Sequence, residues 1–281
     1  MAKPPAPEAR VRGAWLALLV LVLPSSGWPH DLWMVPGKYR LRADEPTRVF
    51  INNGDSFPES LTLVGGHRIA EMRSWSPAGE LQFSEFRVDG KSLTFEFQSS
   101  AEGVHVLGLA TRPRTVRMKA EDFEAYLAEE RLTAIAAMRE ELGESAEPAV
   151  ERYAKWAKAV VGVEPVPAEG ASLWSEPVGH RLEIVPLDYP NRLEPGGTLR
   201  IRVLFEGAPL AGAAIVGARA SGPAREIEIA ADASGEAALT VTAPGRWYVR
   251  AIHMIRLQGD PDVQWESYWG TLTFEVSSVS P

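Results

Sequence analysis

The sequence contains no cysteine. That absence excludes disulfides, thiolate metal ligands, thiol nucleophiles and lipoprotein anchoring through a cysteine. Three catalytic patterns are also missing: the G-x-S-x-G elbow, a glycine-rich phosphate loop opening a helix, and the H-E-x-x-H zinc motif. With 45% apolar residues and nine tryptophans, a conventional hydrophobic core is available instead. We therefore expect a protein that is not an enzyme; a hydrolase is the least supported alternative.

Long apolar runs are scarce. The longest, residues 14–23, is too short to span a bilayer comfortably and follows Lys3, Arg10 and Arg12. Residues 24–27 are small and turn-prone. This order is typical of a secretory signal peptide over residues 1–27, and an uncleaved anchor is the alternative. We expect a periplasmic or otherwise exported protein, with no integral membrane span after signal cleavage.

Positive charge is in the minority. The chain has 29 Lys and Arg against 37 Asp and Glu, a formal net charge of −8. Loss of residues 1–27 leaves 26 against 36, since this segment holds three basic residues and one acidic residue. A mature charge of about −10 argues against binding nucleic acid through its phosphates. It also gives no reason to expect attraction to an anionic membrane, whereas cations remain conceivable ligands.

The first half of the mature chain is predicted to form short strands. Between residues 47 and 109, apolar stretches end at turn dipeptides such as Asn53-Gly54 and Asp89-Gly90. Residues 92–97 alternate apolar and polar side chains, as a half-buried strand does. We predict an N-terminal β domain over residues 28–118.

The pattern changes near residue 119 to helical spacing. The first predicted helix ends near Gly143, and a second is expected from about Pro148, which a first helical turn tolerates. Tyr153, Ala157 and Val160 would then share one face of this second helix. The sequence thus predicts a helical hairpin over residues 119–162, followed by a linker over residues 163–180.

Residues 181–277 contain seven further strand-like stretches with turn signals between them. The segments 207–213, 232–236 and 244–249 resemble the repeating pattern of carboxypeptidase-regulatory-like β modules, which implies a scaffold and no activity. Overall we predict a mainly β protein: two immunoglobulin- or transthyretin-like β-sandwich domains with a helical hairpin inserted between them.

Histidines are the candidate metal ligands. His105 and His253 share strand faces with apolar residues, so each is expected to point inward or to lie beside a cleft. His30 lies near the expected mature terminus. Imidazole nitrogens with a carboxylate suit nickel, cobalt, copper or zinc. The alternative is that these histidines are hydrogen-bonded core residues.

Seven motifs, in the same order along nearly the whole mature chain, resemble the DUF4198 family of exported bacterial proteins. They are HDLW at residues 30–33, NGDSFP at 53–58, FEAYL at 123–127, RYAKWAK at 152–158, LEIVPLD at 182–188, RAIHM at 250–254 and WESYW at 265–269. The resemblance singles out His30 and His253, with Glu266 as a carboxylate ligand. The family's cleavage region ends in Ala before His, whereas this chain has Trp28-Pro29.

Two functions follow as expectations. The family was once grouped with nickel-uptake transporter components, which implies a periplasmic protein that binds a divalent transition metal and passes it to an inner-membrane uptake transporter. His30, His105, His253 and Glu266 would be its ligands. The alternative is an envelope scaffold or a glycan- or protein-binding module without metal. In that case Trp265 and Trp269 would present an aromatic surface, unless both are buried in the core.

Overall fold

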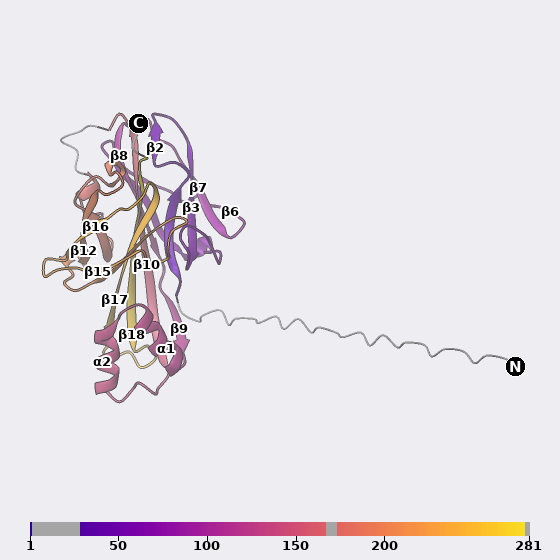
Figure 1. Cartoon of the computed structure of the whole chain (residues 1–281), viewed down its shortest axis with the longest axis vertical. Coiled ribbons are helices and arrows are strands. Elements are labelled where there is room, and N and C mark those ends of the chain that lie inside the picture. The colour runs from indigo at the N-terminus through magenta and orange to yellow at the C-terminus, as the bar shows by residue number, and fades with distance from the viewer. Residues whose placement is uncertain (2–28, 167–172, 279–281) are drawn as a thin grey trace.

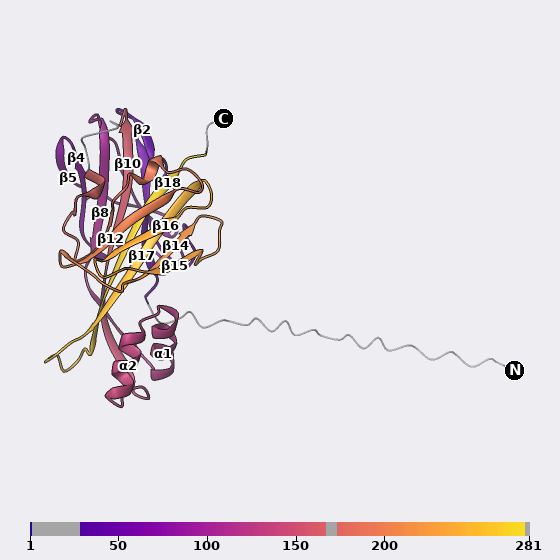
Figure 2. The ribbon, with the colours of Figure 1, turned by 60° about the vertical axis from the view of Figure 1, so that its left-hand side comes forward.

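A computed structural model of the chain describes Met1 and residues 29–166 and 173–278. Apart from Met1, the predicted signal peptide lies outside these ranges, and so does part of the predicted linker. None of the helices within them is long and apolar enough to cross a membrane. The two sandwiches predicted from the sequence are present, and they share one large central sheet (Figures 1 and 2).

The central sheet has ten strands and draws on both halves of the chain. Its main path runs through β15 (Ile227–Ala230), β14 (Ala214–Arg219), β17 (Gly245–Arg256), β18 (Trp265–Val276), β10 (Ala149–Glu164), β8 (Gly103–Thr111), β4 (Ile69–Ser76) and β5 (Gly79–Gln82). Two further strands, β2 (Arg40–Arg42) and β9 (Arg114–Met118), also pair with β10. Strand β10 therefore joins the two halves of the molecule.

A smaller sheet covers each face of the central one. In chain order, the N-terminal sheet holds β1 (Asp31–Pro36), β3 (Thr47–Gly54), β6 (Arg87–Asp89) and β7 (Ser92–Phe97). The C-terminal sheet holds β11 (Leu182–Pro186), β12 (Thr198–Phe205), β13 (Ala208–Pro209) and β16 (Glu236–Thr240). Short 3₁₀ turns lie at Gly66–Arg68, Leu173–Ser175 and Pro190–Arg192.

Alternate residues of β10 enter two different cores. Ala157, Ala159, Val161 and Val163 enter the core beneath the N-terminal sheet. Val160 enters the core beneath the C-terminal sheet, where Trp156 packs against it. Because both faces of this strand are buried, its sequence is a nearly continuous apolar run and lacks the apolar–polar alternation of a half-exposed strand.

Only the first part of the predicted hairpin is helical. Helices α1 (Ala120–Glu129) and α2 (Thr133–Glu141) both lie before residue 143, at the end of the molecule reached by β17 and β18 (Figures 1 and 2). The prediction of a second helix from about Pro148 is wrong, because that segment forms strand β10. Its apolar residues, buried on both faces, happen to match helical spacing as well.

Candidate functional site

The HDLW motif anchors strand β1 to the central sheet. The hydroxyls of Thr271 and Thr273 on β18 donate to the carbonyls of Leu32 and Met34, both at 2.6 Å. These bonds satisfy backbone acceptors on β1, which is an edge strand of its own sheet. The residue just before β1, His30, is therefore held in a fixed place.

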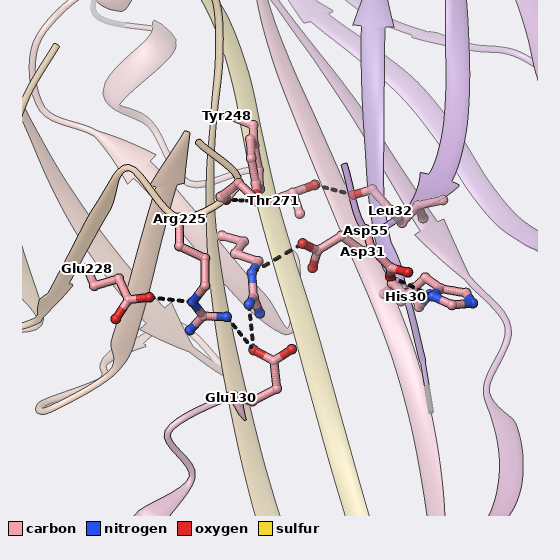
Figure 3. Close-up of polar contacts among 12 residues, drawn as sticks. His30, Asp31, Leu32, Asp55, Glu130, Arg225, Glu228, Tyr248 and Thr271 are labelled. Carbon is pink, nitrogen blue, oxygen red and sulfur yellow. Dashed lines mark hydrogen bonds and ion pairs between the residues drawn. The ribbon is translucent and has the colours of Figure 1, made fainter. Parts of the chain in front are cut away.

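His30 pairs with a carboxylate from the NGDSFP loop. Its Nδ1 lies 2.6 Å from Oδ1 of Asp55, and the ring is largely buried while Asp55 is exposed (Figure 3). Trp33 fixes this loop, since its indole N–H donates to the carbonyl of Pro58 at 3.1 Å. The Trp33 ring also packs edge-on against Phe57, with ring centroids 5.5 Å apart. Two of the motifs thus build one imidazole–carboxylate pair.

The structure places His105 in the N-terminal core. It is 1% exposed, and its Nε2 lies 2.8 Å from the carbonyl of Ala101. Burial lowers its pKa, and its ring meets the edge of Phe97 at a centroid distance of 5.4 Å. These contacts are those of a core histidine, and they lie away from His30.

His253 and Glu266 lie on neighbouring strands, but each has other contacts. The His253 ring packs on Phe205, with centroids 4.5 Å apart. Glu266 accepts hydrogen bonds from the Tyr268 hydroxyl at 2.6 Å and from Arg152 at 3.0 Å. Burial would raise the pKa of Glu266, but these two partners outweigh it and lower the pKa.

The four predicted metal ligands therefore do not form one cluster. Within the described part of the chain, no group of three or more His, Asp or Glu side chains is arranged to hold a metal ion. The predicted aromatic surface is not available either. Trp265 is 0% exposed and Trp269 is 2% exposed, and both belong to the core beneath the helices.

A cavity of about 330 Å³ opens beside His30. We call it the His30 pocket. Its walls come from residues at and just before the start of β1, the end of β3, the segment before β4, the end of β8 with β9, and β10. The lining residues are Pro29, His30, Leu32, Asn53, Thr62, Leu63, Val64, Arg68, Thr111, Arg114, Thr115, Val116, Tyr153 and Lys155.

Three cationic side chains line this pocket, and none of its lining residues is Asp or Glu. They gather around Tyr153. The guanidinium carbon of Arg68 lies 5.8 Å from the centre of the Tyr153 ring, and Nζ of Lys155 lies 5.3 Å from it. Arg114 stands opposite Tyr153 in the β9–β10 ladder. Burial lowers the pKa of Arg68, and the like charge of Arg114 adds to that effect.

Lys155 is the most deeply buried of the three cations. It is 5% exposed, and its Nζ donates to the carbonyl of His30 and to Oδ1 of Asn53, the latter at 2.8 Å. Burial lowers the pKa of Lys155 to about 7; the attraction of Asp31 opposes this shift and the repulsion of Arg68 adds to it. The amine therefore changes charge near neutral pH.

A carboxylate network lies on the other side of the HDLW motif. Arg250 on β17 lies 3.2 Å from Asp31 and 2.5 Å from Glu130, the residue that follows α1. Glu130 also lies 3.6 Å from Arg225 (Figure 3). Burial raises the pKa of Asp31 to about 6 although Arg250 opposes the shift. This network joins the helices to the start of β1.

Sequence reasoning found His30 but missed the cations around it. Lys155 lies inside a predicted helix, so its contacts with His30, Asn53 and Thr111 could not be inferred. A usable signal was present nonetheless, because the HDLW, NGDSFP and RYAKWAK motifs all contribute residues to the pocket. Motifs far apart in sequence that share a resemblance to one family are candidates for one site.

Fold and pocket together define a two-sandwich β protein with a cavity of the size that small ligands occupy. The chain belongs to the family described as Domain of unknown function (DUF4198), whose model matches residues 28–255. This confirms the family resemblance inferred from the seven motifs. No curated protein matches the sequence.

Solved structures show only weak likeness. The D0-D1 domain of intimin is 13% identical, with 87% of this chain and 97% of that chain covered and a TM-score of 0.22. Fibronectin(III)-like modules of Clostridium thermocellum CbhA are 8% identical, with 87% and 94% covered and a TM-score of 0.22. The Yersinia pseudotuberculosis adhesin InvE is 11% identical, with 86% and 58% covered and a TM-score of 0.22. At these TM-scores the likenesses carry no argument about this chain.

Proposed function

We propose that the mature chain is an exported binding protein that holds a small ligand in the His30 pocket and performs no chemistry on it. The signal-like leader supports export to the periplasm. The observation that carries the proposal is the pocket itself. Five separate segments meet there around a buried lysine, Lys155, with Arg68 half-buried and Arg114 exposed beside it. Burying such groups costs stability, so they are retained chiefly where they serve a function.

Blocking the pocket tests this proposal without assuming a ligand chemistry. Thr115 is an exposed β9 residue in the pocket wall, so Thr115→Trp should fill the cavity. Thr240→Trp is the matched control, because Thr240 is an exposed strand residue of the C-terminal sheet. Calorimetric titration would use nickel(II), succinate, inorganic phosphate and glucose as probes.

We expect at least one probe to bind the wild-type protein and the Thr240→Trp variant but not Thr115→Trp. The proposal fails if no probe binds, or if every probe that binds does so equally well with the pocket filled. Thermal unfolding of both variants verifies that each remains folded.

The pairing of His30 with Asp55 favours a second candidate function. An imidazole and a carboxylate 2.6 Å apart are a partial site for nickel, cobalt, copper or zinc. Such a protein would pass its metal to an inner-membrane uptake transporter. Two protein ligands are fewer than the three or four that tight zinc sites use, so we expect affinity no tighter than micromolar.

Nickel titration of His30→Gln and Asp55→Asn tests this candidate. Loss of nickel binding in both variants, with His105→Gln unchanged, would support it. Equal nickel affinity in wild type and His30→Gln would eliminate it.

A further inference from the structure

We propose that the ligand of the His30 pocket is a small organic dicarboxylate, bound by Arg68, Arg114 and Lys155. This inference rests on the proposed binding function and specifies its ligand. It goes beyond the sequence-based expectation of a metal, and it assigns contact roles to three residues that were not among the predicted ligands.

The cations that line the His30 pocket have no carboxylate in contact with them in the described part of the chain. Arg114 has no ion-pair or hydrogen-bond partner for its side chain in the described part of the chain. Arg68 donates only to the backbone carbonyl of Pro113, at 3.1 Å. Lys155 donates to two neutral oxygens. Three cations thus face one cavity with no carboxylate in its lining, in a chain whose net charge is −8.

The positions of the cations favour a ligand with more than one negative charge. Arg68 and Lys155 both lie within 6 Å of the Tyr153 ring centre, and Arg114 stands opposite Tyr153 on the next strand. Like charges held this close repel one another, and an anion between them relieves that repulsion. A single carboxylate would leave most of this positive charge unmatched. Arginine suits carboxylates because its planar fork donates two parallel hydrogen bonds.

Neutral donors are also directed toward the pocket. The Thr62 oxygen accepts a hydrogen bond from the Asn53 amide at 2.8 Å, and the Thr111 oxygen accepts one from the Lys155 backbone N–H at 2.9 Å. Both threonine hydroxyls therefore keep their own proton for a further acceptor. Both residues line the cavity.

The remaining wall is apolar and favours an organic anion over an inorganic one. Leu63, Val64 and Val116 contribute aliphatic surface to the same cavity. A carbon skeleton between two carboxylates would contact these side chains, whereas phosphate or sulfate would leave them facing water. The cavity volume of about 330 Å³ accommodates a chain of a few carbon atoms.

Calorimetric titration of the mature protein with succinate tests the proposal, with butyrate and inorganic phosphate as comparison ligands. We expect succinate to bind at least tenfold more tightly than either. Arg114→Gln should weaken succinate binding about tenfold, since one charge-assisted contact is lost. The matched control is Arg117→Gln, because Arg117 is also exposed on β9 but does not line the pocket. The succinate affinity of this variant should stay within about twofold of the wild-type value.

Other outcomes separate the two proposals. Tighter binding of phosphate than of succinate would overturn the dicarboxylate and indicate an inorganic anion. Equal effects of Arg114→Gln and Arg117→Gln would also overturn it. If nickel or glucose binds and Thr115→Trp blocks it while succinate does not bind, the ligand class is wrong and the binding function stands. If Thr115→Trp blocks no probe, the binding function itself is wrong.

Discussion

Two buried lysines three residues apart on β10 have opposite surroundings. Lys158 is 1% exposed and lies 2.8 Å from Oε1 of Glu183, on the face toward the C-terminal sheet. Glu183 also accepts backbone hydrogen bonds from Val178 and Gly179, at 2.8 and 3.0 Å. Each charged group of this pair has an opposite charge in contact with it inside the protein. Lys158 is therefore a structural lysine.

Lys155 has equal burial without an opposite charge in contact with it. It is 5% exposed on the other face of β10, and it donates only to a carbonyl and to an amide oxygen. Its pKa falls to about 7, because burial is not offset by an adjacent carboxylate. The comparison teaches that burial alone does not reveal the role of a charged side chain. A missing counterion beside a cavity is the more informative sign.

The largest effect should come from breaking the structural pair. Glu183→Gln leaves the Lys158 ammonium buried opposite a neutral amide. We expect the free energy of unfolding to fall by about 3–5 kcal/mol, the range for a buried pair that loses one partner. Urea denaturation measures it. The double variant with Lys158→Met should recover most of the loss, because no buried charge then remains; failure to recover would mean that Lys158 is not the cause.

The same kind of change at the other lysine should affect binding rather than folding. Lys155→Met removes the amine but keeps a similar length of apolar chain. We expect the free energy of unfolding to change by less than about 1.5 kcal/mol, since only two hydrogen bonds to neutral acceptors are lost. Succinate affinity should fall at least tenfold. A large loss of stability with unchanged affinity would reverse the assigned roles of the two lysines.

Binding should depend on pH around neutrality. The Lys155 amine is protonated below its pKa of about 7 and neutral above it, so succinate affinity should fall as pH rises from 6 to 8.5. Since only the one proton of the Lys155 amine is involved, succinate affinity cannot fall by more than about tenfold per pH unit. Asp31, Asp55 and Glu151 favour the charged amine and Arg68 opposes it. Titration calorimetry at several pH values measures the slope, and Lys155→Met should abolish it.

Lys155 also predicts a pH dependence of stability. Its folded pKa of about 7 lies below the unfolded value of about 10.4, so between these values the unfolded chain binds more protons. This group's contribution to the free energy of unfolding therefore rises with pH across that window. Comparing urea midpoints of wild type and Lys155→Met at pH 6.5 and 9 isolates the contribution. An identical pH slope in the two proteins would contradict the depressed pKa.

The smallest effect should come from a third buried charge, outside the pocket. Glu151 on β10 is fully buried and accepts hydrogen bonds from Ser267 and from the Tyr126 hydroxyl. Burial raises its pKa to about 7. Glu151→Gln should stabilise the protein by about 1 kcal/mol at pH 8, where the buried carboxylate is charged, and by little at pH 5.5. Its succinate affinity should match that of the wild type at pH 6, where Lys155 is mostly charged and Glu151 mostly neutral.

Local sequence patterns predicted much of the fold. Turn dipeptides and alternation located both β halves, and the helical spacing after residue 119 corresponds to α1 and α2. The pattern failed at β10, which is rich in Ala and Lys and is covered on both faces. Its helix-favouring residues and its apolar residues on both faces made the sequence of this segment look helical. In the structure, pairing with β8, β9 and β18 makes it a strand.

The candidate site was only partly predictable for the same reason. His30 stood out because an imidazole near a motif is visible in sequence. Lys155 and Arg114 line the same pocket because β9 pairs with β10, which places Arg114 opposite Tyr153, and residue spacing alone cannot reveal that pairing. The absence of a carboxylate beside Lys155 is likewise a property of packing. No one-dimensional pattern distinguishes it from Lys158.

Proton uptake on ligand binding tests the central claim most directly. Succinate would be titrated at pH 7.5 in two buffers of different ionisation enthalpy. With Lys155 near its pKa of about 7, binding should recharge the amine and take up as much as about 0.8 proton per ligand. The uptake should vanish in Lys155→Met. Binding without proton uptake, or the same uptake in Lys155→Met, would contradict the assignment of Lys155 as the ligand-binding lysine.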